Sequence, residues 1–198
     1  MRLFVAVELP EETKRVIAAV QKRIAAALGS ARDSLKLVKP EQIHLTLLFL
    51  GEVQEARVQP VIDAMNIAVD LPVFDIAFGG AGVFPSRGVP RVLWIGVTEG
   101  APPLTILQSE IARRIRALGI AFDDRPFQPH LTVGRWRESR GRARGTPKPL
   151  RREGGALRKV AEISNLQVTR ATLYQSRLSS SGQAYTALAH ATLAREWP

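Results

Sequence analysis

Pro40-Glu41-Gln42-Ile43-His44-Leu45-Thr46 recurs as Pro126-Phe127-Gln128-Pro129-His130-Leu131-Thr132, and five of the seven positions agree in the pattern P-x-Q-x-H-L-T. The two histidines stand 86 residues apart. Alternate residues of a strand point to the same side, so each copy puts one imidazole and one hydroxyl on one face and a leucine on the other. Each copy therefore supplies half of a site.

A histidine on an apolar strand is usually a packed structural residue, and a single H-x-T triplet would be read in that way. Here the triplet occurs twice within a wider matching frame, and two of the three histidines of the chain lie in it. The duplication favours a paired acid and base, because imidazole titrates close to neutral pH.

Length and composition indicate a globular protein. A chain of 198 residues with 45% hydrophobic content can form one large domain or two small lobes. Its apolar runs all stay below 18 residues, and Glu8 comes too early for the core of a signal peptide. There is no cysteine, hence no disulfide or thiolate metal site. We expect a soluble, cytoplasmic monomer with no membrane association.

Positive charge is concentrated in one segment. The formal charge of the chain is +10, and residues 135–159 carry ten basic against two acidic side chains. The basic residues are Arg135, Arg137, Arg140, Arg142, Arg144, Lys148, Arg151, Arg152, Arg158 and Lys159. Such a cluster is typical of a surface that binds a polyanion; the alternative is a solvated loop with no partner.

Hydrophobic periodicity predicts an alternation of strands and helices. Strands are expected over 3–7, 47–51 as the continuation of the first motif, 73–78, 91–97, 168–174 and 184–193, with a glycine break at 79–82. Helices are expected over 11–28, 58–69 and 104–118, with a short one over 156–163.

The repeat extends beyond the two motifs. At an offset of 90 residues, Leu3-Phe4-Val5-Ala6-Val7 matches Leu93-Trp94-Ile95-Gly96-Val97, Ala27-Leu28-Gly29 matches Ala117-Leu118-Gly119, and Phe84-Pro85-Ser86-Arg87 matches Tyr174-Gln175-Ser176-Arg177. We therefore expect a single bilobal domain over 1–198, with an internal repeat of roughly 1–90 and 91–198 related by a pseudo-twofold axis. The motifs would then line one central cleft from opposite walls.

The chemistry that suits two facing histidines is attack at phosphorus. One imidazole can activate the nucleophile while the other protonates the leaving oxygen, and the hydroxyls of Thr46 and Thr132 can donate to the non-bridging oxygens. No metal and no other cofactor are expected, because neither histidine has a matched second ligand nearby and Glu41 has no counterpart in the other copy. A serine hydrolase is disfavoured because the chain lacks a G-x-S-x-G elbow.

These features resemble the two-histidine (2H) phosphoesterases, and among them the RNA 2′,3′-cyclic phosphodiesterase family, also named 2′-5′ RNA ligase. The resemblance rests on His44-Leu45-Thr46-Leu47, His130-Leu131-Thr132-Val133, Arg2-Leu3-Phe4-Val5-Ala6-Val7, Phe49-Leu50-Gly51 and Leu173-Tyr174-Gln175-Ser176. It implies a bilobal α+β fold with a cleft between two antiparallel sheets. It also implies opening of RNA 2′,3′-cyclic phosphates to 2′-phosphates, with His44 as proton donor, His130 as proton acceptor, and Thr46 and Thr132 on the phosphate.

Three questions stay open at this stage. The same acid and base would serve 2′-5′ ligation, and a non-catalytic RNA-binding module could use exposed aromatic side chains such as Phe4 and Trp94. The resemblance also implies that Arg135 contacts the phosphate. Strict alternation sends Arg135 to the face opposite His130 and Thr132, unless a bulge at Gly134 turns the strand.

Overall fold

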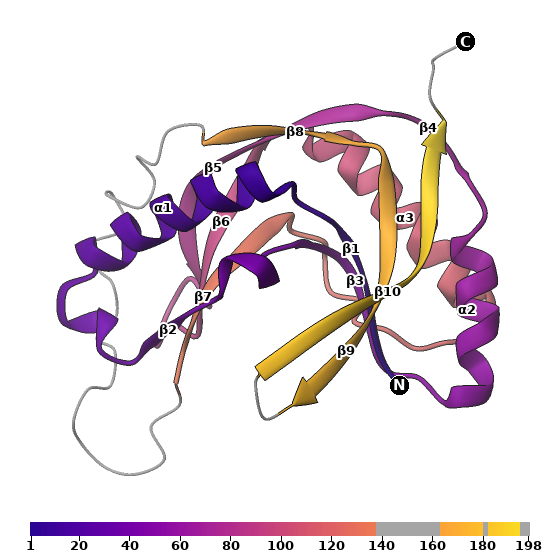
Figure 1. The fold of residues 1–198 in the computed structure, drawn as a ribbon, viewed down its shortest axis with the longest axis horizontal. Helices are drawn as coiled ribbons and strands as arrows, with labels where there is room; N and C mark the ends of the chain where they lie inside the picture. The colour runs from indigo at the N-terminus through magenta and orange to yellow at the C-terminus, as the bar shows by residue number, and fades with distance from the viewer. Residues whose placement is uncertain (138–162, 180–181, 195–198) are drawn as a thin grey trace.

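The computed structural model describes residues 1–137, 163–179 and 182–194, and its strands follow one continuous order (Figure 1). The strands are β1 (Arg2–Val7), β2 (Leu35–Leu37), β3 (Leu45–Glu52), β4 (Val69–Pro72), β5 (Phe74–Phe84), β6 (Val92–Glu99), β7 (His130–Trp136), β8 (Ser164–Val168), β9 (Arg170–Ser179) and β10 (Gly182–Ala194). The α-helices are α1 (Glu11–Ala27), α2 (Val58–Met65) and α3 (Ala101–Ala117), and short 3₁₀ helices span Gly29–Arg32, Pro40–Gln42 and Glu55–Arg57. The order is β4-β10-β9-β1-β3-β7-β6-β5-β8, with β2 paired to β7.

The strand order is symmetric about the contact between β3 and β7. Outward from it run β3-β1-β9 on one side and β7-β6-β5 on the other, and their neighbours pair antiparallel. The two sides meet at one registered pair, Leu45 with Leu131. The expected α+β class is thus confirmed. The two antiparallel sheets that were expected are joined edge to edge at this pair and form one continuous sheet.

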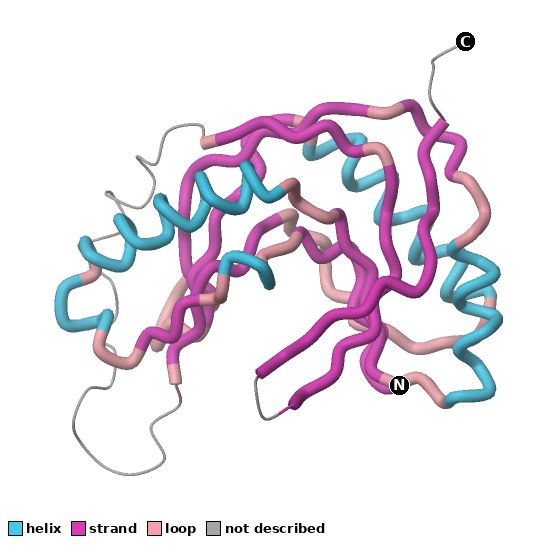
Figure 2. Tube along the Cα trace, in the orientation of Figure 1, coloured by secondary structure: helices cyan, strands magenta, loops and turns pink. Residues whose placement is uncertain are grey.

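The helices cover strands of the opposite half of the chain. Helix α1 packs against β7 and β8, whereas α3 packs against β3 and β4 and α2 against β9 and β10. Figure 2 shows α1 and the α2 and α3 pair over opposite ends of the strand layer. No helix of the described residues has the length and apolarity needed to cross a membrane.

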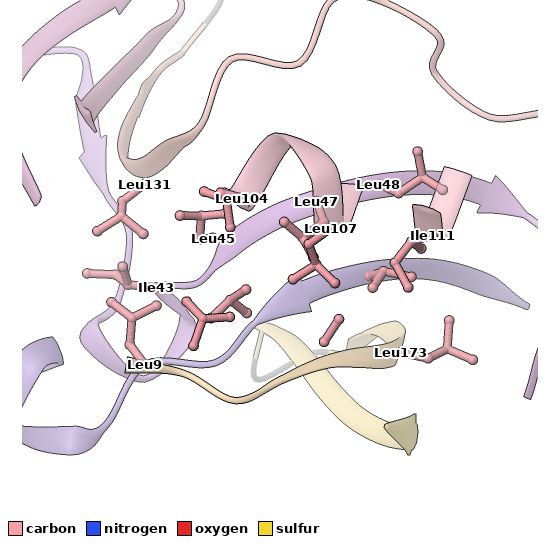
Figure 3. Packing of buried hydrophobic residues seen from close by; sticks show 14 of the residues in the cluster. Leu9, Ile43, Leu45, Leu47, Leu48, Leu104, Leu107, Ile111, Leu131 and Leu173 are labelled. Carbon is pink, nitrogen blue, oxygen red and sulfur yellow. The ribbon is translucent and has the colours of Figure 1, made fainter. Parts of the chain in front are cut away.

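The core lies between these helices and the strands. Leu104, Leu107 and Ile111 of α3 are fully buried; Leu104 lies beside Leu45 and Leu131, and Leu107 and Ile111 follow farther along β3 (Figure 3). Burial of one such side chain contributes about 1.5 to 3 kcal/mol. The seam between the two motifs is therefore anchored by the core on one face, and its other face is left for polar side chains.

The predicted break at residues 79–82 is wrong, because β5 runs through it to Phe84. The glycines are used to make room within the strand. A Cβ atom at Gly82 would overlap the Trp94 indole, and one at Gly96 would lie 3.3 Å from the same ring. A register shift between Gly79 and Ala81 keeps β5 paired to β6 across this stretch.

The second predicted helix also ends earlier than expected, at Met65, and Val69 starts β4. The side chain of Arg114 explains this end, because its guanidinium donates to the carbonyls of Ala64, Ile67 and Ala68 at 3.2, 2.6 and 2.8 Å. These carbonyls would otherwise lack donors at a helix C-terminus.

Other differences concern short strands, because β2, β4 and β8 were not expected from the periodicity. Strands of three to five residues give too few alternations to be recognised. The short helix predicted over 156–163 lies outside the described residues except for its last position, and so does the basic segment beyond Arg137.

Candidate active site

The two motifs place four polar side chains on one face of the sheet. Leu45 and Leu131 are fully buried and face each other across the seam. When that register is extended by one residue, Thr132 lies opposite His44 and His130 opposite Thr46; all four are half-buried. We call this surface the histidine face. The two histidines are diagonal neighbours on it, and such neighbours lie about 7 to 8 Å apart.

Each histidine is oriented by a backbone carbonyl two residues earlier. Nδ1 of His44 lies 2.8 Å from the carbonyl oxygen of Gln42, and Nδ1 of His130 lies 2.6 Å from that of Gln128. A carbonyl only accepts, so Nδ1 must carry the proton in both rings. Nε2 is then the atom that each neutral imidazole offers to a substrate, and no described residue hydrogen-bonds to it.

Aromatic rings enclose His44. The centroid of Phe4 lies 4.8 Å from the imidazole, and Tyr185 meets the imidazole edge to face at 5.1 Å. Tyr174 stacks on Phe4 at 5.3 Å, so the three rings form one cluster. Water is thereby displaced from one side of His44.

Aromatic rings also lie beside His130. Phe84 meets its ring edge to face at 5.1 Å, and Trp94 lies 5.3 Å from Phe84. Trp94 lies across Gly82 and Gly96, whose missing side chains leave space for the indole. In the sequence repeat, Phe84 corresponds to Tyr174 and Trp94 corresponds to Phe4. The aromatic surroundings of the two histidines are therefore repeated as well.

Burial lowers the pKa of both imidazoles, which favours the neutral form of each ring. Burial lowers the pKa of His44 to about 4, against the opposing hydrogen bond to Gln42, and the charges of Arg135 and Lys14 add to the lowering. Burial and Arg135 also lower the pKa of His130 below its usual 6.5. An anion bound between the two rings opposes both effects, because it stabilises imidazolium.

The threonine hydroxyls are available to a ligand. In the part of the chain that the structure describes, neither Thr46 nor Thr132 forms a side-chain hydrogen bond, and neither hydroxyl is a buried unpaired group. Each can therefore donate a hydrogen bond to an oxygen placed over the histidine face.

A β-bulge interrupts β7 just after Thr132. Trp94 of β6 pairs with Thr132, but the preceding residue, Leu93, pairs with Gly134. Val133 is the extra residue on β7, and it is fully buried. A Cβ atom at Gly134 would approach that of the buried Leu93 to 3.4 Å, so Gly134 also faces the core. Two consecutive core-facing positions shift the alternation of the strand by one.

The bulge turns Arg135 to the histidine face. Arg135 is exposed, whereas Trp136 after it is buried. The positive charge of Arg135 lowers the pKa of His44, His130 and Tyr185, which puts it within electrostatic reach of all three. The sequence made a bulge at Gly134 the condition for Arg135 to reach this face; the structure has a bulge one residue earlier, with Val133 as the extra residue. Gly134 has an ordinary φ and is needed for space beside Leu35, where a Cβ would lie 2.8 Å from Cδ1.

The bulge is held by a buried side chain that sequence reasoning missed. Gln21 of α1 is 2% exposed, and its amide nitrogen donates to the carbonyls of Val38 and Val133. The carbonyl of Val133 also accepts from the backbone N–H of Val38 at 3.0 Å. The position of Gln21 on the apolar side of an amphipathic helix could have revealed this contact, since a buried glutamine needs hydrogen-bond partners.

Two further neighbours of the site, Lys14 and Tyr185, could not be recognised from the sequence. Lys14, near His44, reads as a surface lysine of a helix, yet its side chain is 11% exposed and pairs with Glu11 at 2.8 Å. Tyr185 lies outside both motifs and has no counterpart in the repeat. Across the described ranges, no three His, Cys, Asp or Glu side chains gather where they could hold a metal ion. The groups that this face offers are imidazoles, hydroxyls and one guanidinium.

Paired histidines, each followed by a threonine on the same face, suit chemistry at phosphorus, and the matching family model is that of a class of phosphoesterases. The family model of the LigT-like phosphoesterases matches residues 7–94 and again residues 95–185. The chain belongs to this family, and the two matches divide it where the repeat does.

Relatives and solved structures agree with this assignment. An RNA 2′,3′-cyclic phosphodiesterase of Archaeoglobus fulgidus is 39% identical over 135 residues, which is 68% of this chain and 72% of the relative. One of Methanothermobacter thermautotrophicus is 33% identical over 187 residues, which is 94% of this chain and 95% of the relative. The crystal structure of E. coli LigT with 3′-AMP has a TM-score of 0.74 at 25% identity and covers 98% of both chains.

Proposed function

We propose that the protein hydrolyses 2′,3′-cyclic phosphodiester ends of RNA to 2′-phosphomonoesters. The observation that carries the proposal is the matched anchoring of His44 and His130, whose Nδ1 atoms lie 2.8 and 2.6 Å from the carbonyl oxygens of Gln42 and Gln128, which precede the adjacent strands β3 and β7. Two Nε2 atoms are thereby offered to one phosphate. The names of the curated relatives support the choice of a cyclic phosphate end as substrate.

In the proposed reaction His130 is the base and His44 the acid. Water attacks phosphorus, and Nε2 of His130 takes a proton from it as the new P–O bond forms. The P–O3′ bond breaks, and protonated Nε2 of His44 gives its proton to O3′. The products are a 2′-phosphate and a free 3′-hydroxyl, and the two histidines have exchanged protonation states.

Because the pKa of His44 is lowered to about 4, its imidazole must gain a proton when substrate binds if it is to act as the acid. A phosphodiester carries one negative charge and removes water from the face, and both changes favour imidazolium beside it. The neutral free site would therefore take up one proton together with the substrate. We assign this proton to His44, because His130 must keep an unprotonated Nε2 to act as the base.

Thr46, Thr132 and Arg135 would bind the phosphate. Each hydroxyl lies opposite the histidine of the other motif, so both can donate to the non-bridging oxygens, where charge builds up during attack. Arg135 contributes a guanidinium that is charged at every relevant pH. Its effect on both histidine pKa values supports a position beside the same phosphate.

The test is incubation with an oligonucleotide that ends in a 2′,3′-cyclic phosphate, followed by ³¹P NMR of the product terminus. A 2′-phosphomonoester is expected; a 3′-phosphomonoester would reverse the assignment of the leaving oxygen. Addition of an acceptor with a free 5′-hydroxyl tests ligation, which would give a 2′-5′ linkage. Binding with no turnover would reduce the protein to an RNA-binding module.

The control for each histidine variant is His190→Ala. His190 lies on β10, three strands away from β3, where its ring contacts the Thr172 hydroxyl at 3.0 Å. It is the third histidine of the chain, so its removal makes the same chemical change outside the proposed site. Parental turnover is expected for this variant.

A further inference from the structure

Two basic residues face each other directly beside the histidine face. Lys36 of β2 pairs in register with Arg135 of β7. Side chains opposite each other in an antiparallel pair have Cβ atoms about 4.5 to 5.5 Å apart, and like charges in such positions destabilise the sheet. The chain therefore keeps an unfavourable pair at this position of β2.

The orientation of β2 follows from its neighbours. Leu35 points to the core side, where its Cδ1 lies close to Gly134, and Leu35 and Leu37 are half-buried. Lys36, between them, is exposed and points to the other side. The bulge has turned Arg135 to that side as well, so Lys36 and Arg135 extend the histidine face along β7 toward the edge strand β2.

No described carboxylate offsets these charges. Neither Lys36 nor Arg135 takes part in an ion pair or a side-chain hydrogen bond within residues 1–137, 163–179 and 182–194. By contrast, Arg113, Arg114, Arg116, Arg125 and Arg170 are each paired with an acidic side chain. Two cations that are kept close and unneutralised form a site for an anion.

The spacing identifies which anion fits. Positions on one face of a strand lie roughly 6.6 Å apart, about one nucleotide of an extended single strand. A phosphate over Thr132 and the two histidines thus puts the next phosphate of the chain near Arg135 and Lys36. We propose that Lys36 forms a second phosphate subsite, with Arg135 between it and the terminal phosphate, and that this subsite binds the phosphodiester on the 5′ side of the terminal nucleotide.

This inference rests on the proposed function and names its substrate class. A mononucleoside cyclic phosphate has no second phosphate, so Lys36 contributes nothing to its turnover. A dinucleotide with a cyclic phosphate end fills the subsite. The enzyme is therefore one that acts on the ends of RNA chains and uses free cyclic mononucleotides less well.

The test compares the two substrates in Lys36→Gln and in a matched control, Lys22→Gln, which removes the same charge from the exposed side of α1. For Lys36→Gln, kcat/KM with the dinucleotide is expected to fall about twofold to tenfold, in line with one exposed ion pair. Turnover of the mononucleotide stays at the parental value. Lys22→Gln keeps both activities.

Salt dependence gives a second readout. Each phosphate contact on a single strand contributes about 0.7 to the slope of log affinity against log salt. Lys36→Gln is expected to lower that slope for the dinucleotide and leave it unchanged for the mononucleotide. Equal effects on both substrates, or none on either, would overturn the second subsite while cyclic phosphate hydrolysis stands. A parental protein inactive on both substrates would overturn the proposed function itself.

Discussion

The side-chain amide of Gln21 donates to the carbonyl of Val133, the extra residue of the β7 bulge, from a position that is 2% exposed. The two residues are 112 positions apart in the chain. This contact joins helix α1 to the irregularity that turns Arg135 toward the histidines. A buried residue with no access to substrate thus supports the bulge that sets the position of Arg135, the side chain proposed to bind phosphate.

Substitution of Gln21 by leucine is expected to impair catalysis through Arg135. The change removes the Gln21 donor from the Val38 carbonyl and leaves the Val133 carbonyl with only the backbone N–H of Val38, at a cost of about 1 to 3 kcal/mol, and it frees the bulge to return to regular register. We expect kcat/KM to fall about as far as in Arg135→Ala, and the double variant to be no worse than either single variant. NMR titration should show the His130 pKa rising in both variants, because the guanidinium charge has moved away.

The matched control for Gln21→Leu is Arg114→Met. Arg114 is also a mostly buried donor, with a side chain that is 10% exposed, but its carbonyl partners end α2, far along the strand order from β7. Its loss should lower the free energy of unfolding and keep parental kcat/KM per folded molecule. If Gln21→Leu behaved in the same way, Gln21 would be structural only.

Removal of either imidazole should abolish most turnover. His44→Ala and His130→Ala each eliminate one proton transfer, so kcat is expected to fall by about 10² to 10⁴. Thr46→Ala and Thr132→Ala remove one hydrogen bond each and should lose less. Single-turnover kinetics with a cyclic phosphate end measures all four. Small and equal losses in the two histidine variants would contradict acid and base roles.

The pH dependence should reveal the lowered histidine pKa values. In the free enzyme the acid must be protonated and the base unprotonated, so kcat/KM should peak on the acid side of pH 6.5, between the pKa of His44, about 4, and the lowered pKa of His130. The bound phosphate raises both pKa values, which moves the optimum of kcat to higher pH. Arg135→Ala removes a positive charge, so its lower kcat/KM should peak at higher pH than that of the parent. A kcat/KM optimum above that of kcat would contradict the assignment.

Chelation should leave the activity unchanged. The proposed mechanism uses only imidazoles, hydroxyls and a guanidinium, and no cluster of metal-ligating side chains occurs in the described ranges. Turnover of a cyclic phosphate in the presence of EDTA is therefore expected to equal turnover without it. Inhibition that added zinc or magnesium reverses would require a metal in the reaction.

The sequence predicted the parts of the site that depend on local pattern. Alternation along a strand placed His44 with Thr46 and His130 with Thr132, since each motif contains all the information that this requires. For Arg135 the same alternation predicted only that a bulge in the strand would be needed to bring its side chain to the histidine face. Whether β7 bulges depends on Gln21, Leu35 and Leu93, which are far away in sequence.

The fold was predictable to a similar degree. The long amphipathic segments gave α1 and α3, whereas the glycines of β5 misled, because a glycine run ordinarily marks a turn. Only the three-dimensional contact of Gly82 with Trp94 accounts for them. We propose on the symmetric strand order that residues 1–198 act as one domain of two related halves, as the repeat indicated.

The exchange of helices between the two halves has a consequence for folding. Each half relies on a helix of the other half to cover its strands, because α1 packs against β7 and β8 while α3 packs against β3 and β4. The seam at Leu45 and Leu131 forms only when residues 86 positions apart meet, so loop-closure entropy opposes its formation until both halves are present. A fragment ending before α3 should therefore stay unstructured, and urea should abolish turnover in the same cooperative transition that melts the helices.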